Sequence, residues 1–96
     1  MNIEYSKQFV RSAQKLNGKY RESLRKVIEN LKGAETIHQV RNCIKLAGFD
    51  DHYRIRMGNY RIILLIRIVD QTAFMQLLLS RGDVYKKGVE MGLRRK

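Results

Sequence analysis

Arginines that lie close together without acidic neighbours are the side chains of this sequence best suited to chemistry. Arg54, Arg56, Arg61 and Arg67 fall within residues 53–69, a segment that contains no Asp or Glu. A guanidinium group stays protonated and binds two phosphate oxygens at once through its planar fork. The segment therefore predicts a binding site for phosphate or another anion. The alternative is that arginine merely supplies the polar side of a solvent-exposed antiparallel sheet.

The residues around these arginines predict a β-hairpin that gathers them on one face. Gly58-Asn59 is typical of a two-residue hairpin turn; apolar and polar side chains alternate before it, and β-branched residues are frequent after it. With that turn, Arg56 pairs with Arg61 and Arg54 pairs with Ile63, and paired residues share a face. A like-charge pair destabilises a sheet, whereas a phosphate site benefits from one. Leu65 and Arg67 extend this face, and the opposite, apolar face is expected to comprise Tyr53, Ile55, Met57, Tyr60, Ile62 and Leu64.

The remaining titratable side chains give a weaker signal. His52 precedes the arginine-rich strand and is a candidate acid or base, since histidine titrates near neutral pH, although a loop histidine usually has no such role. Cys43 is expected to be a small core residue. No spacing of Cys, His, Asp and Glu suits a metal, and no glycine-rich loop precedes a helix to bind a nucleotide. We therefore expect neither a metal nor a cofactor.

The charge balance predicts a polyanionic partner. The chain has 20 Lys and Arg against 9 Asp and Glu, a net charge of +11, which suits nucleic acid, an acidic protein or a membrane surface. The alternative is that the cations only keep the chain soluble. A single cysteine excludes an internal disulfide, so we expect a reducing cytoplasm. The longest apolar run, residues 62–66, is too short to cross a bilayer, and the first residues lack the features of a secretion signal.

Apolar periodicity divides the chain into a helical first half and a β-rich second half. Ser6 is a predicted N-cap, Asn17-Gly18 a predicted helix stop, and Gly33 the end of a second helix that begins near Tyr20. Helices followed by a meander of strands predict one α+β domain over residues 1–96, with the helices on one sheet face. The expected elements are a strand over 2–5, the two helices, a helical turn over 36–40, strands over 43–46, 53–57, 60–68 and 72–79, and a short helix or basic tail over 84–92.

Two motifs resemble the RelE/ParE superfamily of bacterial and archaeal type II toxins. They are residues 53–62 (YRIRMGNYRI) and 79–86 (LSRGDVYK), and the resemblance extends over nearly the whole chain. It implies two N-terminal helices packed on one face of a curved antiparallel sheet of about four strands, the RelE-like microbial RNase fold. RelE-like members cleave mRNA in the ribosomal A site, and a cognate antitoxin silences them.

The resemblance also implies a role for each matching residue. Arg61, Arg81 and Tyr85 match catalytic positions in a reaction in which a ribose 2′-hydroxyl attacks its own phosphate. The two arginines stabilise the phosphorane, and Tyr85 stacks on a base or transfers a proton. Some relatives have lysines where this chain has arginines, and arginine, with a pKa above about 12, is a poor base. The base is then His52 or Tyr85, or catalysis is mostly electrostatic. The resemblance implies RNA binding by Arg54 and Arg56, and we expect Arg67, Lys86 and Lys87 to bind RNA as well.

The partners implied by the resemblance are a cognate antitoxin, mRNA and the ribosome, without a membrane or a small-molecule cofactor. Two alternatives stay open at this point. One is a ParE-like toxin that lacks RNase activity and acts on DNA gyrase. The other is a catalytically inactive relative that only binds RNA or an acidic partner.

Overall fold

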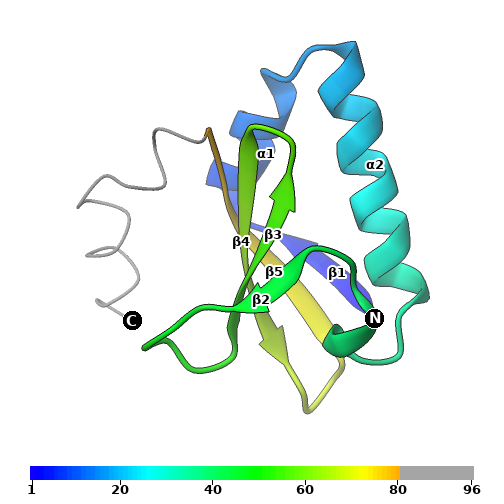
Figure 1. Ribbon diagram of the computed structural model, residues 1–96, viewed down its shortest axis with the longest axis vertical. Helices are drawn as coiled ribbons and strands as arrows, with labels where there is room; N and C mark the ends of the chain where they lie inside the picture. Colours follow the sequence, from blue (N-terminus) through cyan, green and yellow to red (C-terminus); the bar gives the residue numbers. More distant parts are fainter. Residues whose placement is uncertain (81–96) are drawn as a thin grey trace.

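Residues 1–80 form two α-helices, a short 3-10 helix and a five-stranded sheet (Figure 1). The structure is a computed structural model that describes these 80 residues, so the helix or tail expected over 84–92 lies outside the described part. The elements are β1 (Asn2–Tyr5), α1 (Lys7–Gln14), α2 (Gly18–Gly33), the 3-10 helix η1 (Ile37–Gln39), β2 (Cys43–Lys45), β3 (His52–Met57), β4 (Tyr60–Arg67) and β5 (Thr72–Ser80).

The sheet has the strand order β1-β5-β4-β3-β2. Its β2-to-β5 part is the antiparallel meander that the sequence predicts, and the α+β class is confirmed. Two details correct the expectation: the described sheet has five strands, and β1 pairs with β5 in parallel, so the sheet is mixed. A parallel pair needs a long crossover connection, and here all the other elements lie between the two strands in sequence, so local patterns contain no signal for it.

Capping residues fix where the two helices begin. The Ser6 hydroxyl accepts a hydrogen bond from the Phe9 amide at 2.9 Å, which confirms the predicted N-cap of α1, and donates one to the Gln76 carbonyl of β5 at 2.6 Å. The helix α1 ends at Gln14, before the stop predicted at Asn17-Gly18, and Asn17 instead begins the next helix. Its side-chain oxygen accepts from the Tyr20 amide at 3.1 Å and so caps α2. The connection between the helices is therefore short, and both helices reach the same side of the sheet.

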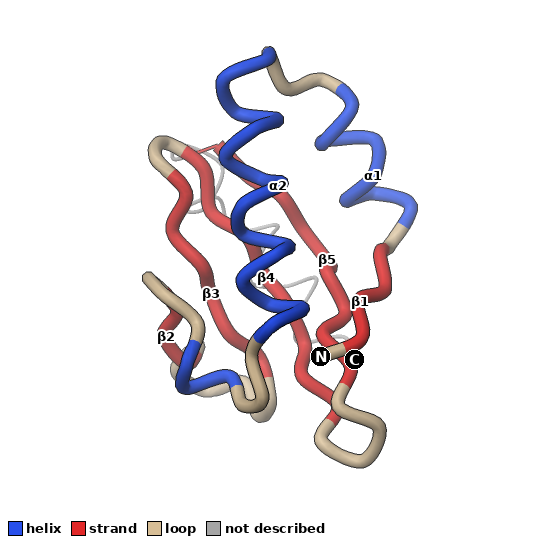
Figure 2. Tube along the Cα trace, turned by 90° about the vertical axis from the view of Figure 1, so that its right-hand side faces the viewer, coloured by secondary structure: helices blue, strands red, loops and turns tan. Residues whose placement is uncertain are grey.

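The hydrophobic core lies between the helices and one face of the sheet. Figure 2 views the molecule from the helix side, with α2 lying across the sheet in front of β4. The predicted apolar face of the β3–β4 hairpin is confirmed, since its residues are either buried in this core or packed against it. Fully burying one such side chain contributes about 1.5–3 kcal/mol. The largest fully buried side chains are Phe9, Leu31, Ile55, Ile62, Leu64 and Met75.

The β3–β4 turn contacts the beginning of α2. Gly58 has a φ of 57°, which a two-residue hairpin turn of type II′ requires at this position. A Cβ atom on Gly58 would lie 3.2 Å from Tyr20 Cε1, and the Tyr20 ring packs edge-on against Tyr60 with centroids 4.8 Å apart. The tip of the hairpin is thereby fixed against the helical layer, while the other face of both strands points away from the helices.

Candidate nucleic-acid interface

The register of the hairpin places the predicted arginines on the sheet face opposite the helices. Arg56 lies across from Arg61 and Arg54 across from Ile63, as the two-residue turn predicts. Arg67 continues the same side of β4, because it is separated from Arg61 by an even number of residues. We call Arg54, Arg56, Arg61 and Arg67 the arginine face.

Arg61 is held in place by its own turn. Its Nη1 group donates to the Gly58 carbonyl and to the Tyr60 carbonyl, both at 2.9 Å. These bonds satisfy carbonyls at the hairpin tip and fix the guanidinium there, next to the position opposite Arg56. Within residues 1–80, the Nε and Nη2 groups of Arg61 have no further partner. The Arg61 side chain is therefore positioned in advance and keeps free donors for an anion.

Arg54 and Arg56 are the cations of this face without a protein partner. In the part of the chain that the structure describes, neither side chain forms an ion pair or a hydrogen bond. Arg56 is exposed, and Arg54 is half-buried beside Ile63, which is only 2% exposed. Arg54 and Arg56 are neighbours on one face of β3, and their unpaired guanidinium groups repel each other. They therefore do not stabilise the fold, whereas an anionic ligand would stabilise both groups.

Arg67 differs from the other arginines because the fold supplies it with acids. Its Nη2 group lies 2.9 Å from Glu4 Oε2 of β1 and 3.4 Å from Asp70 Oδ2 in the β4–β5 turn. The sequence showed no acid among the arginines, but the parallel pairing of β1 brings Glu4 to this side of the sheet. The RNA-binding role expected for Arg67 stays a prediction, and two carboxylates now compete for its charge.

His52 is the predicted acid or base, and the structure buries it. The residue is 8% exposed; its Nδ1 lies 2.7 Å from the Asp50 carbonyl, and its Nε2 is buried with no hydrogen-bond partner. A carbonyl only accepts hydrogen bonds, so Nδ1 carries the proton and Nε2 holds the lone pair. That lone pair is the group a base would use, and in this conformation it does not reach the surface. The geometry therefore gives His52 no direct contact with a substrate.

Apolar side chains line the arginine face between β4 and β5. Because paired residues share a face, Leu79 lies beside Arg61, Leu77 beside Ile63, and Phe74 beside Leu65. Phe74, Leu77 and Leu79 are half-buried. An RNA strand has charged phosphates and apolar base surfaces, and this face offers cations on β3 and β4 with an apolar floor beside them.

A β-bulge interrupts β5 beside the same face. The register with β4 shifts between Ile63 and Leu64, which leaves Gln76 as the extra residue between Met75 and Leu77. Gln76 is 5% exposed, and neither its Oε1 nor its Nε2 has a hydrogen-bond partner. Bulges occur often near functional sites, where they redirect a strand. No pattern in the sequence indicates this bulge.

Four of the predicted site residues cannot be placed. Arg81, Tyr85, Lys86 and Lys87 lie outside the described residues, so their roles remain predictions. β5 ends at Ser80, which pairs with Tyr60 at the hairpin-tip end of the sheet, one residue beyond the pair of Arg61 with Leu79.

Among residues 1–80 there is no group of three or more His, Cys, Asp or Glu side chains suited to a metal ion. No helix in that range is long and apolar enough to span a membrane.

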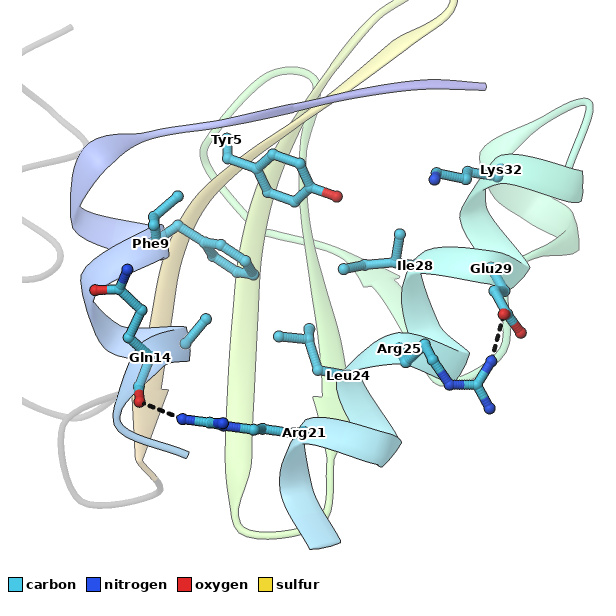
Figure 3. A pocket seen from close by; sticks show the side chains of 11 residues that line it. Tyr5, Phe9, Gln14, Arg21, Leu24, Arg25, Ile28, Glu29 and Lys32 are labelled. Atoms are coloured by element: carbon cyan, nitrogen blue, oxygen red, sulfur yellow. Dashed lines mark hydrogen bonds and ion pairs between the residues drawn. The ribbon is translucent and has the colours of Figure 1, made fainter. Parts of the chain in front are cut away.

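A groove of about 590 Å³ opens on the helical side, between α1, α2 and the end of β1 (Figure 3). Its floor is apolar, and Tyr5 and Val10 leave 42% and 40% of their surface exposed in it. Polar side chains form the rim: the Arg21 guanidinium donates to the Gln14 carbonyl at 2.8 Å, and Arg25 pairs with Glu29. The periodicity of α1 did not predict an exposed Val10. We call this feature the helix groove; its apolar residues are Tyr5, Phe9, Val10, Ala13, Leu24 and Ile28.

The fold and the arginine face together define a small basic α+β protein suited to binding phosphate groups. No protein-family model matches the chain. The toxin RelE3 of Methanocaldococcus jannaschii is 29% identical to it over 86 residues, which cover 88% of this chain and 96% of the relative.

Solved structures give the same result. The RelB–RelE antitoxin–toxin complex from Methanococcus jannaschii matches with a TM-score of 0.74 and 26% identity, over 85% of this chain and 94% of the matched one. The RelE–RelB complex of Pyrococcus horikoshii OT3 matches with a TM-score of 0.72 and 26% identity, over 84% and 94% of the respective chains. The chain is RelE-like in sequence and in fold, which confirms the resemblance predicted from its two motifs.

Proposed function

We propose that this chain is the toxin of a type II toxin–antitoxin system and inhibits translation by cutting mRNA on the ribosome. Its similarity to RelE3, which is a toxin, and to chains from RelB–RelE antitoxin–toxin complexes supports the toxin class. The observation that carries the RNA target is the arginine face, where Arg54 and Arg56 have no acidic partner within residues 1–80. A ribosomal target also places the protein in the cytoplasm, as its single cysteine predicts.

The proposed reaction needs no group from outside the RNA as nucleophile. The ribose 2′-hydroxyl loses its proton and attacks the adjacent phosphorus, an O2′–P bond forms, and the P–O5′ bond breaks. The products are a 2′,3′-cyclic phosphate and a 5′-hydroxyl, whose oxygen takes up a proton. The phosphorane between these states carries two negative charges, which preorganised cations stabilise.

Each residue of the site has a proposed task in this reaction. Arg61 stabilises the phosphorane with its free Nε and Nη2 donors, because the turn carbonyls already fix its guanidinium. Arg81 is proposed to act with it, and Arg54 and Arg56 hold flanking phosphates. Lys86, Lys87 and Arg67 contribute further cations, with Arg67 weakened by its two carboxylates.

Tyr85 is the proposed group for proton transfer. His52 is disfavoured because its Nε2 is buried, and the guanidinium groups do not give up protons near neutral pH. A phenol hydroxyl can both donate and accept a hydrogen bond, as a group that transfers a proton must. Proton transfer by Tyr85 and electrostatic stabilisation by the arginines can both contribute to the rate of RNA cleavage.

A cognate antitoxin is the proposed protein partner, and the helix groove is its proposed binding site. Tyr5 and Val10 offer apolar surface that an amphipathic helix would cover, and the rim carries more cations than acids. An acidic, amphipathic antitoxin segment would complement both properties. The helix groove lies on the opposite side of the sheet from the arginine face, so the same antitoxin must extend around the protein to cover both surfaces.

Expression of the chain without an antitoxin tests the proposed function. We expect translation to stop and mapped mRNA ends to fall in the ribosomal A site. Purified protein should likewise cut mRNA on programmed ribosomes and leave 2′,3′-cyclic phosphate ends. Induction of the DNA-damage response with DNA breaks would instead indicate a gyrase target. A chain without any toxicity would be the inactive relative that only binds RNA or an acidic partner.

A further inference from the structure

A second cationic feature lies at the sheet edge, where α2 faces β3 and the segment before β2. A concavity of about 410 Å³ opens there, lined on its polar side by Lys26 and Asn30 of α2, Arg41 and Asn42, and Arg56 of β3. No Asp or Glu lines it. We call these five residues the basic notch. Three cations from three separate segments meet in it, 15 and 30 positions from Lys26 along the chain.

Backbone bonds hold the walls of the basic notch together. The Arg41 amide donates to Asn30 Oδ1 at 3.2 Å, and the Arg56 amide donates to the Asn42 carbonyl at 3.0 Å. Asn42 has a φ of 57°, a left-handed conformation that asparagine adopts more readily than most residues. The segment before β2 is thereby tied to α2 on one side and to β3 on the other. The amide nitrogen of Asn30 is left without a bond within residues 1–80.

The cations of the notch are not paired, unlike their neighbours on α2. Arg25 bonds to Glu22 and Glu29, whereas Lys26, Arg41 and Arg56 form no ion pair in the described range. Lys26 has only a weak interaction with Glu22, whose pKa is lowered first by Arg25 and then by Lys26. Bringing three unpaired cations to one concavity opposes folding slightly, and an anion in the notch would remove that cost.

We infer that the basic notch binds a backbone phosphate of RNA, outside the cleavage site and continuous with it. This inference rests on the proposed function for the identity of the polyanion. Arg56 belongs to both features, so a strand on the arginine face can pass around the edge of β3 into the notch. Cations and amides bind phosphate without regard to base identity. An acidic protein segment would also need exposed apolar side chains. Val27, Val40 and Ile55 line the notch, but Val40 and Ile55 are buried, whereas the helix groove exposes Tyr5 and Val10.

Removal of two notch cations outside the arginine face tests the inference. In Lys26→Gln/Arg41→Gln, both changed side chains are exposed, so the fold should persist. The matched control is Lys15→Gln/Lys19→Gln, which removes the same charge from exposed positions outside the notch. The affinity of each protein for a short oligouridylate is measured across a range of salt concentrations. We expect the slope of log affinity against log salt to shrink by about 1.4 in the notch variant, or about 0.7 per lost contact, and not in the control.

An unchanged slope in the notch variant, or an equal loss in the control, would overturn the inference. Weaker antitoxin binding with an unchanged RNA slope would also overturn it and assign the notch to an acidic protein. Oligouridylate binding does not depend on cleavage. A smaller slope in the notch variant, together with a failure of the unchanged protein to cut mRNA on ribosomes, would therefore reject the proposed function and leave the inference standing.

Discussion

The arginine face and the helix groove lie on opposite sides of one sheet, and the arginines that β3 and α2 contribute to them differ: those of β3 have no partner within residues 1–80, whereas Arg21 and Arg25 of α2 do. On the arginine face, Arg54 and Arg56 have no partner within residues 1–80. In the groove, Arg25 forms ion pairs with two glutamates, which hold its guanidinium on the rim. Exposed ion pairs stabilise a protein by only about 0–1 kcal/mol, so the difference lies in availability rather than in stability. The number of charged residues in the sequence does not show which cations have a partner in the fold.

The same contrast separates two kinds of ligand. A surface of unpaired guanidinium groups with an apolar floor suits a phosphate chain carrying flat bases. A groove with an apolar floor, an exposed Val10 and a rim that carries more cations than acids suits an acidic amphipathic protein segment. With the proposed function, the protein would then bind its substrate and its inhibitor on separate sides, and an antitoxin long enough to reach both would cover them. Variants that affect one side and spare the other test this division.

The largest effect is expected on the arginine face. Arg61→Ala removes a donor that the turn holds toward the phosphorane, so single-turnover cleavage on programmed ribosomes should slow by about 10²–10³. Ribosome binding should change little, because other cations remain. The control is Arg11→Ala, which removes an exposed arginine of α1. Cleavage by Arg61→Ala at the control's rate would remove Arg61 from the catalytic site.

Arg61→Lys separates charge from geometry at the same position. Lysine keeps the charge, but its single nitrogen cannot donate to the Gly58 and Tyr60 carbonyls, as Arg61 Nη1 does, and also supply the separate Nε and Nη2 donors of arginine. We expect Arg61→Lys to leave binding unchanged and to restore only part of the cleavage rate that Arg61→Ala loses. Full restoration of the rate would mean that the charge alone matters for catalysis and that the Nε and Nη2 donors do not.

The next effect is expected in the helix groove. Val10→Asp places a carboxylate on its apolar floor, and the affinity for the antitoxin should fall by about 30-fold, the loss typical of a central contact worth about 2 kcal/mol. Cleavage in the absence of antitoxin should be unaffected. Val69→Asp is the matched control, since Val69 is fully exposed at the β4–β5 turn, away from the groove. Equal losses of antitoxin affinity in both variants would contradict the helix groove as the antitoxin-binding site.

A smaller effect is expected at the hairpin tip, where the two sides meet. Gly58→Ala puts a side chain on a residue with a φ of 57° and 3.2 Å from Tyr20 Cε1, so the free energy of unfolding should fall by about 1–2 kcal/mol. Gly33→Ala, at the end of α2 and with open space around it, should stabilise the protein by about 0.4–1 kcal/mol. Urea unfolding measures both. A neutral Gly58→Ala would show that the turn tolerates another conformation.

The hairpin and its two faces could be predicted from the sequence because their causes are local. A two-residue turn fixes the pairing of Arg56 with Arg61, and alternation then assigns every side chain of the hairpin to a face. The N-cap at Ser6 follows the same logic, since its partner is three residues away. The resemblance to RelE-like toxins adds residue roles that no periodicity contains.

The features that could not be predicted depend on distant segments. The pairing of β1 with β5 joins Asn2 to Thr72 and brings Glu4 to Arg67, which changes the charge of one predicted site residue. The basic notch needs Lys26 and Arg41 to meet through a turn with no strong sequence signal. His52 is adjacent to the arginines in sequence, yet it is buried rather than available. Each of these outcomes is decided by tertiary packing.

The smallest effect distinguishes arginines within the arginine face itself. Arg54→Ala should reduce the slope of log RNA affinity against log salt by about 0.7–0.9, because an unpaired cation releases counterions from the phosphate that it binds. Arg67→Ala should reduce it less, since Glu4 at 2.9 Å and Asp70 at 3.4 Å already neutralise part of its charge. Glu4→Gln should then raise RNA affinity slightly by freeing Arg67. Equal slopes for Arg54→Ala and Arg67→Ala would mean that RNA displaces both carboxylates, and that all four arginines act as one surface.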